Sequence, residues 1–107
     1  MFTRVVEITS KAGKARDVSR TVSDKVLAIL KNQPGFMDEI TLVSDEDPNR
    51  VLAISFWKSK ENAEKYQREQ YNNVVETFRN LMEGPPQVRT YEVETSTFHK
   101  IAAGKAA

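Results

Sequence analysis

Few residues in this sequence carry side chains that could do chemistry, and Tyr66 and Arg4 are the candidate catalytic residues. The 107 residues include no cysteine and a single histidine, His99, so thiolate nucleophiles, disulfides and cysteine metal sites are excluded. The sequence contains no phosphate-binding loop, metal-ligand cluster or nucleophile–base set. A tyrosine hydroxyl can hydrogen-bond a substrate, and an arginine can stabilise a phenolate or another oxyanion. We therefore expect electrostatic catalysis without a metal.

Both candidates also have a simpler explanation. Tyr66 follows Ala63 at helical spacing and precedes Gln70 on the same line, so it can be a packing tyrosine whose hydroxyl reaches the surface. Arg4 lies in a β-type segment, where an arginine often pairs with an acid on a neighbouring strand, here Glu92 or Glu94. The sequence leaves both alternatives open.

Trp57 and Val6 are the candidate substrate-binding residues beside Tyr66. Trp57 could stack on a planar aromatic molecule, although a tryptophan more often belongs to the core, and we favour that interpretation. Val6 shares a strand face with Arg4, because strand residues two apart point the same way. A histidine can act as a general base near neutral pH, but His99 lies near the end of the chain, where we expect a bystander.

The elements that must position these residues alternate between β-type and helical patterns. Ser59 is placed to cap a helix, since its hydroxyl can accept from backbone N–H groups two or three residues later. Gly84-Pro85-Pro86 ends that helical region. The polar stretch from Asp45 to Asn49 is short enough for a hairpin. The expected strands are 2–9, 36–44, 51–57 and 87–95, and the expected helices are 14–31 and the stretch from Ser59 to Met82, with Asn72–Asn73 as a candidate point of division.

The order βαββαβ predicts an α+β fold of the ferredoxin-like type, a four-stranded antiparallel sheet with both helices on one face. The run from Val51 to Trp57 is almost continuously apolar, which is typical of a strand buried on both faces. Two helices can cover only one face of the sheet. We therefore expect Val5, Leu52, Ile54 and Phe56, or their neighbours one position away, to lie on a bare apolar face. A second copy of the chain would cover this face, giving a homodimer.

Length and composition limit the remaining possibilities. The length fits one domain, which we place at residues 1–97 with a tail at 98–107 that frays from Thr97. The net charge of +1 gives no reason to expect nucleic acid or a membrane as a partner. No apolar run is long enough to span a bilayer and no signal peptide opens the chain, so we expect a cytoplasmic protein.

Two short motifs resemble the antibiotic biosynthesis monooxygenase domain family. They are the turn Pro34-Gly35-Phe36 and the helix start Trp57-Lys58-Ser59-Lys60, and the element order agrees from about Phe2 to Thr95. The resemblance implies a dimeric α/β barrel. It also implies an activity of some members, the oxidation of polycyclic aromatic phenols to quinones with O2 and no cofactor. Tyr66 falls at a position that this family uses for substrate contact.

A second branch of the family that this sequence resembles degrades haem. Its asparagine, tryptophan and haem-ligating histidine correspond here to Val6, Tyr66 and Glu76, so none of the three is kept. Without an axial imidazole, haem has no obvious ligand apart from Tyr66. We therefore expect no haem and no other cofactor.

The sequence thus supports two hypotheses about function. The first is a small cofactor-independent monooxygenase that acts on an aromatic or quinol-like molecule, with Trp57, Val6 and Tyr66 positioning the substrate and Arg4 stabilising charge. The second is a non-catalytic dimeric barrel that binds a small apolar ligand.

Overall fold

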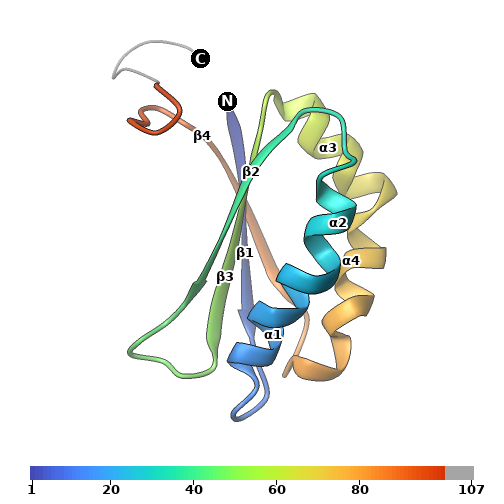
Figure 1. Cartoon of the computed structure of the whole chain (residues 1–107), viewed down its shortest axis with the longest axis vertical. Coiled ribbons are helices and arrows are strands. Elements are labelled where there is room, and N and C mark those ends of the chain that lie inside the picture. Colours follow the sequence, from blue (N-terminus) through green and yellow to red (C-terminus); the bar gives the residue numbers. More distant parts are fainter. Residues whose placement is uncertain (101–107) are drawn as a thin grey trace.

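Four antiparallel strands form one sheet in the computed structural model, which describes residues 1–100 (Figure 1). The strand order is β2-β3-β1-β4, and the helices all lie on one face of the sheet. This arrangement confirms the predicted ferredoxin-like α+β fold. The strands are β1 (Phe2–Thr9), β2 (Phe36–Val43), β3 (Arg50–Trp57) and β4 (Gln87–Glu92).

The first helical region runs without a break but contains a π-helical turn that the sequence analysis did not predict. It consists of α1 (Ala15–Thr21), the π-helical segment η1 (Val22–Val26) and α2 (Leu27–Leu30). Val18, Val22, Val26 and Leu30 are buried at intervals of four residues. In a regular α-helix, residues four apart are rotated by about 40° around the axis. The wider π turn offsets part of that rotation, so this apolar line stays directed at the sheet.

The second helical region is divided at Gln70, two residues before the predicted point. Helix α3 (Lys60–Glu69) and helix α4 (Tyr71–Phe78) meet there, and the short 3-10 segment η2 (Arg79–Leu81) follows. Gln70 has φ −125° and ψ −21°, outside the helical region. The predicted cap is confirmed, since the Ser59 Oγ accepts a hydrogen bond from the Asn62 N–H at 3.2 Å.

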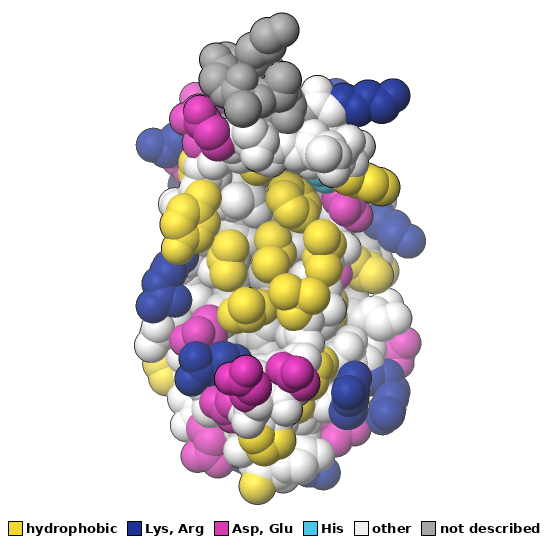
Figure 2. Space-filling model, turned by 90° about the vertical axis from the view of Figure 1, so that its left-hand side faces the viewer, with side chains coloured by type: hydrophobic (Ala, Val, Ile, Leu, Met, Phe, Trp, Pro, Cys, Tyr) yellow, Lys and Arg dark blue, Asp and Glu magenta, His cyan; other side chains and the backbone are white. Residues whose placement is uncertain are grey.

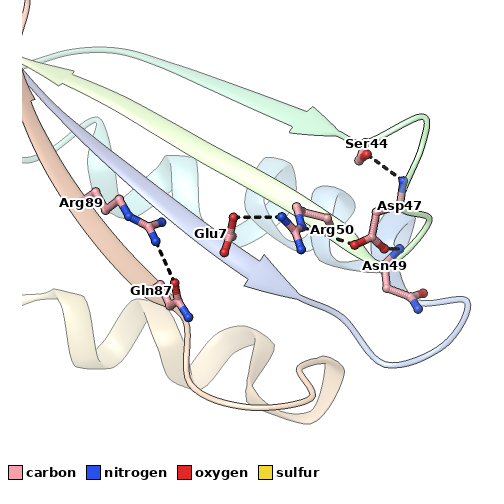
Figure 3. A network of polar contacts seen from close by, with 7 residues as sticks. All are labelled: Glu7, Ser44, Asp47, Asn49, Arg50, Gln87 and Arg89. Carbon is pink, nitrogen blue, oxygen red and sulfur yellow. Dashed lines mark hydrogen bonds and ion pairs between the residues drawn. The ribbon is translucent and has the colours of Figure 1, made fainter.

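The predicted hairpin between β2 and β3 is also present, and its turn is held by side chains (Figure 3). The Ser44 Oγ accepts from the Asp47 N–H at 2.9 Å, and the Asp47 Oδ1 accepts from the Asn49 N–H at 3.1 Å. Arg50 then lies 3.5 Å from Glu7 and 3.4 Å from Asp47. These exposed ion pairs contribute little stability, but they make one end of the sheet polar.

The face of the sheet under the helices, which we call the inner face, carries the core. Its buried strand residues include Val6, Ile8, Val51 and Trp57. The opposite, outer face has no helix over it and carries an apolar cluster, which we call the outer-face cluster. Figure 2 shows hydrophobic side chains gathered there, with charged side chains at one end. Strand pairing places these cluster members side by side: Val5, Ile40, Leu42, Leu52 and Ile54.

The chain leaves strand β4 earlier than predicted. Strand β4 ends at Glu92 rather than at residue 95, and Thr97–Lys100 form a turn against the outer face. The His99 side chain is only 12% exposed; its ring centroid lies 5.2 Å from that of Phe56, and its Nε2 lies 3.9 Å from the Asp38 carboxylate. The aromatic contact and the nearby acid explain why this turn stays on the sheet. Residues 101–107 of the predicted tail lie outside the described residues.

Candidate active site

A small cavity lies between the inner face and the helices, and it includes three of the four residues predicted for the site. Arg4, Val6 and Tyr66 line it together. Its volume of about 30 Å³ is enough for only one or two water molecules. The remaining lining is mostly apolar: Ile8, Val22, Val26, Leu30, Ala53, Val74 and Phe78, with Glu39, Ser55 and Tyr71 as further polar members.

Arg4 is the only cationic residue that lines this cavity among residues 1–100, and it is 3% exposed. Its guanidinium carbon lies 5.0 Å from the ring centroid of Tyr66 and 4.7 Å from that of Tyr71. Stacking of this kind favours a cation over the two ring faces. Its Nη2 donates a hydrogen bond to the side-chain oxygen of Gln67 on α3.

Neither Glu92 nor Glu94, the acids considered as partners of Arg4, pairs with it. Strand β1 pairs with β4 so that Arg4 lies opposite Thr90, while Glu92 lies opposite Phe2 and Glu94 follows the end of the strand. No carboxylate within residues 1–100 forms an ion pair with Arg4. Burial lowers the pKa of the guanidinium from its ordinary value, and the two tyrosines oppose that effect. Because an arginine stays charged in proteins, the cavity contains a positive charge that forms no ion pair within residues 1–100.

Both tyrosines beside Arg4 are in their protonated form at neutral pH. Burial raises the pKa of Tyr66 to about 12, although the Arg4 charge acts in the opposite direction. Burial also raises the pKa of Tyr71. The Tyr71 hydroxyl oxygen is buried and has no hydrogen-bond partner within residues 1–100, which is rare for a buried polar atom. A charged guanidinium and an unpaired hydroxyl therefore lie together in the cavity and are suited to an anionic oxygen.

Trp57 does not line the cavity. It lies in the core, in agreement with the interpretation that we favoured. It is fully buried, with its ring centroid 5.0 Å from that of Tyr66 at an interplanar angle of 31°. Its indole N–H donates to the Ser55 Oγ at 2.9 Å. Trp57 thus supports Tyr66 and orients Ser55, and its predicted direct contact with a substrate has no counterpart in the cavity.

The sequence analysis missed Glu39, Ser55 and Tyr71. Tyr71 follows the break at Gln70, so its direction depends on where the two helices separate. The inward direction of Glu39 depends on an irregularity in β2. Phe36 pairs with Trp57 and Asp38 pairs with Phe56, so two steps along β2 match one step along β3. This bulge adds one residue, so Glu39 points inward and Ile40 outward. The signal in the sequence, apolar side chains at 40 and 42, favours the opposite orientation.

The remaining residues considered for chemistry lie elsewhere. His99 packs on the outer face, on the other side of the sheet from the cavity. Glu76, at the position of the haem ligand, is exposed on α4 and pairs with Arg79. Within residues 1–100, no group of three histidine or acidic side chains is placed to hold a metal ion. In the same part of the chain, no helix combines the length and apolar character needed to cross a membrane.

Comparison with known proteins identifies both a family and a fold. The family model described as antibiotic biosynthesis monooxygenase matches residues 1–84. No relative was found among curated protein sequences.

Several solved structures share the fold. A monooxygenase from the gene ActVA-Orf6 of Streptomyces coelicolor, in complex with the ligand nanaomycin D, has a TM-score of 0.77 and 17% identity, covering 89% of this chain and 88% of that one. SnoaB, a cofactor-independent oxygenase from Streptomyces nogalater, has a TM-score of 0.74 and 16% identity, covering 90% and 95%. NE2512, a Nitrosomonas europaea protein of unknown function, has a TM-score of 0.74 and 14% identity, covering 96% and 95%.

Proposed function

The chain belongs to the antibiotic biosynthesis monooxygenase family, and we propose that it is a cofactor-independent monooxygenase that oxidises an aromatic hydroxyl compound with O2. The observation that carries this proposal is the buried Arg4, which stacks on two protonated tyrosines and forms no ion pair within residues 1–100. The substrate class is an acidic, planar phenol such as a naphthol or a quinol. The names of two structural neighbours, a monooxygenase with bound nanaomycin D and a cofactor-independent oxygenase, support the same kind of reaction.

The reaction of a naphthol needs no redox-active group from the protein, because the substrate itself supplies the electrons that reduce O2. The substrate loses its hydroxyl proton, and the electron-rich phenolate then reduces O2. One oxygen atom enters the ring and the other leaves as water, so one naphthol and one O2 give one naphthoquinone and one water. Arg4 stabilises the phenolate oxygen, and the free hydroxyl of Tyr71 donates to it. The apolar walls exclude water, which strengthens both interactions.

The size of the cavity sets a condition for this chemistry. An aromatic ring is much larger than the 30 Å³ available. The lining side chains therefore have to move apart when the substrate enters. The π-helical segment η1 contributes Val22 and Val26 to the lining, and π turns occur often at functional sites.

The second part of the proposal is a homodimer formed by the outer faces of two copies. Ile40 and Leu42, on the edge strand β2, are 42% and 46% exposed. They belong to an apolar surface that no helix among residues 1–100 covers. Burying several hundred Å² of such surface on each subunit contributes on the order of 10 kcal/mol before association costs. The polar end around Glu7 and Arg50 limits how two copies can align.

The test of the enzymatic proposal is oxygen uptake by metal-free protein with 1-naphthol and 1,4-dihydroxynaphthalene, followed by identification of the quinone product. Arg4→Met should lower the rate by about 10²–10³-fold, the usual effect of losing one oxyanion donor. Arg68→Met, the same change at an exposed position of α3, should have no effect.

Two outcomes would contradict the enzymatic proposal. The first is an Arg4→Met variant that folds and keeps the full rate. The second is wild-type protein that binds these compounds and never exceeds the uncatalysed rate, a result that would favour the alternative of a non-catalytic protein with a small apolar ligand.

A further inference from the structure

Three polar side chains form a row across the inner face of the sheet. Strand pairing places Glu39 opposite Ser55, and Ser55 opposite Arg4. Neighbouring strands lie roughly 5 Å apart, so the backbones of Glu39 and Arg4 are separated by about 10 Å with Ser55 between them. All three residues line the cavity. A bound phenol therefore meets a carboxylate on one side and a guanidinium on the other.

Glu39 is the only carboxylate among residues 1–100 that lines this cavity, and one of its oxygens is free. Its Oε2 accepts a hydrogen bond from the Thr41 hydroxyl at 2.8 Å. Thr41 is its only hydrogen-bonding side chain within the described part of the chain. The other carboxylate oxygen can thus accept a proton or hydrogen bond from a ligand.

The charged groups near Glu39 come from few elements. Asp38 is adjacent but points to the outer face, and Arg4 lies at the far end of the row. The helical segment that packs over β2 contributes only apolar side chains to the cavity, those of Val22, Val26 and Leu30. Burial raises the pKa of Glu39, with a smaller contribution from Asp38, while the Thr41 hydrogen bond lowers it. A raised pKa makes the carboxylate a stronger base.

Ser55 is oriented for a role between the other two. Its Oγ accepts the indole N–H of Trp57 at 2.9 Å, so one lone pair is occupied and the hydroxyl hydrogen points elsewhere. Within residues 1–100 Ser55 is an acceptor in both of its side-chain contacts: its backbone oxygen accepts from Thr3 and its Oγ accepts from Trp57. Its hydroxyl donates no hydrogen bond to any of these residues. Its hydrogen is therefore available to an oxygen atom of the ligand.

We propose that Glu39 is the proton acceptor of this site, taking the hydroxyl proton of a phenol held between it and Arg4. In this step the phenol O–H bond breaks and a carboxylate O–H bond forms. The electron pair stays on the phenolate oxygen, where Arg4 and Ser55 stabilise it. No other reactant takes part. Tyr66 is already protonated and His99 lies on the other face of the sheet, so neither competes for this role. The inference rests on the proposed function and assigns the base that it requires.

The test uses 4-nitrophenol, because its phenol and phenolate forms absorb at different wavelengths. The probe is bound at a pH below its own pKa, where the free probe is neutral, and the protons released are counted by calorimetry in buffers of different ionisation enthalpy. Wild-type protein should bind the phenolate without releasing a proton, because Glu39 takes it up. Glu39→Gln should either bind the neutral phenol or bind the phenolate and release one proton to solvent.

Asp38→Asn is the matched control, since it removes a carboxylate one residue away on the opposite face. It should keep the wild-type spectrum and proton count. In oxygen uptake with 1,4-dihydroxynaphthalene, Glu39→Gln should lower the rate by about 10²–10⁴-fold, and Asp38→Asn should not.

The possible failures separate the two proposals. Wild-type protein that binds the neutral phenol, or that releases a proton on binding the phenolate, overturns the role of Glu39 and leaves the enzymatic proposal standing. So does a Glu39→Gln variant with the wild-type spectrum and proton count. A wild-type protein that binds neither 4-nitrophenol nor any naphthol overturns the proposed function, and the role of Glu39 with it.

Discussion

The two faces of the sheet each depart in part from the usual distribution of polar and apolar side chains. The inner face, covered by helices, carries Arg4, Ser55 and Glu39 in a row, while the uncovered outer face carries the apolar cluster around Ile54. Burying polar groups without partners costs free energy, and so does exposing a large apolar patch. Each face is therefore incomplete in the isolated chain. We infer that a ligand completes the inner face and that a second copy completes the outer one.

The strongest test of this comparison is a charge on the outer face. Ile54 lies between Ile40 and Val5 in the strand register, whereas Phe56 is partly covered by His99. Ile54→Asp should weaken the dimer about a thousandfold or more, because an unpaired charge in apolar surroundings costs several kcal/mol. Sedimentation equilibrium at micromolar concentration should show twice 12.2 kDa for the wild type and 12.2 kDa for the variant. Thr9→Asp, at the exposed end of β1, is the control and should stay dimeric.

A wild-type mass of 12.2 kDa would show that the protein is a monomer and would contradict the proposed homodimer. A variant that remains fully dimeric would show that the interface lies elsewhere.

The inner face is tested by removing its unpaired hydroxyl. Tyr71→Phe deletes the buried oxygen that has no partner, so the free energy of unfolding should rise by about 1 kcal/mol or stay unchanged. The affinity for 4-nitrophenol should fall about tenfold, since one hydrogen bond to the phenolate is lost. Urea unfolding and calorimetric titration measure the two effects.

Tyr91→Phe, on the opposite face of the sheet from the cavity, should leave the affinity for 4-nitrophenol unchanged. If Tyr71→Phe lowers stability and leaves affinity unchanged, its hydroxyl serves the fold rather than a ligand.

The smallest expected effect is a pH dependence of stability caused by Glu39. Burial raises its pKa in the folded state above the ordinary 4.5, so the folded protein binds this proton more tightly than the unfolded chain. Stability is therefore lost as the pH rises from below 4.5 through the raised pKa. Glu39→Gln should remove this loss and raise stability near neutral pH. The gain should be less than about 1 kcal/mol, because the side chain is partly exposed and solvent screens it.

Thermal unfolding at several pH values, with exposed Glu83→Gln as control, measures that difference. A variant whose gain is the same at acid and neutral pH would show that packing, not ionisation, is responsible.

Local sequence patterns were enough to predict most of the fold. The Ser59 cap, the β-type segments and the polar turn before Arg50 act through neighbouring residues, so their structural effects can be read from the sequence. The left-handed turn at Gly35, with φ +79°, is likewise set by a residue without a Cβ. For the site, strand alternation placed Arg4 with Val6, and helical spacing directed Tyr66 inward.

The composition of the cavity depended on contacts that no local pattern contains. Residues 40 and 42 are apolar, and their alternation favours an inward direction, but the bulge beside Phe36 turns Glu39 inward instead. The break at Gln70 sets the direction of Tyr71, and the pairing of β1 with β4 leaves Arg4 without an acid. The sequence by itself thus determined the four strands, the two helical regions and which residues of β1 and α3 face the core. Only the tertiary structure decided which polar groups meet there, because a one-residue shift in a strand exchanges its two faces.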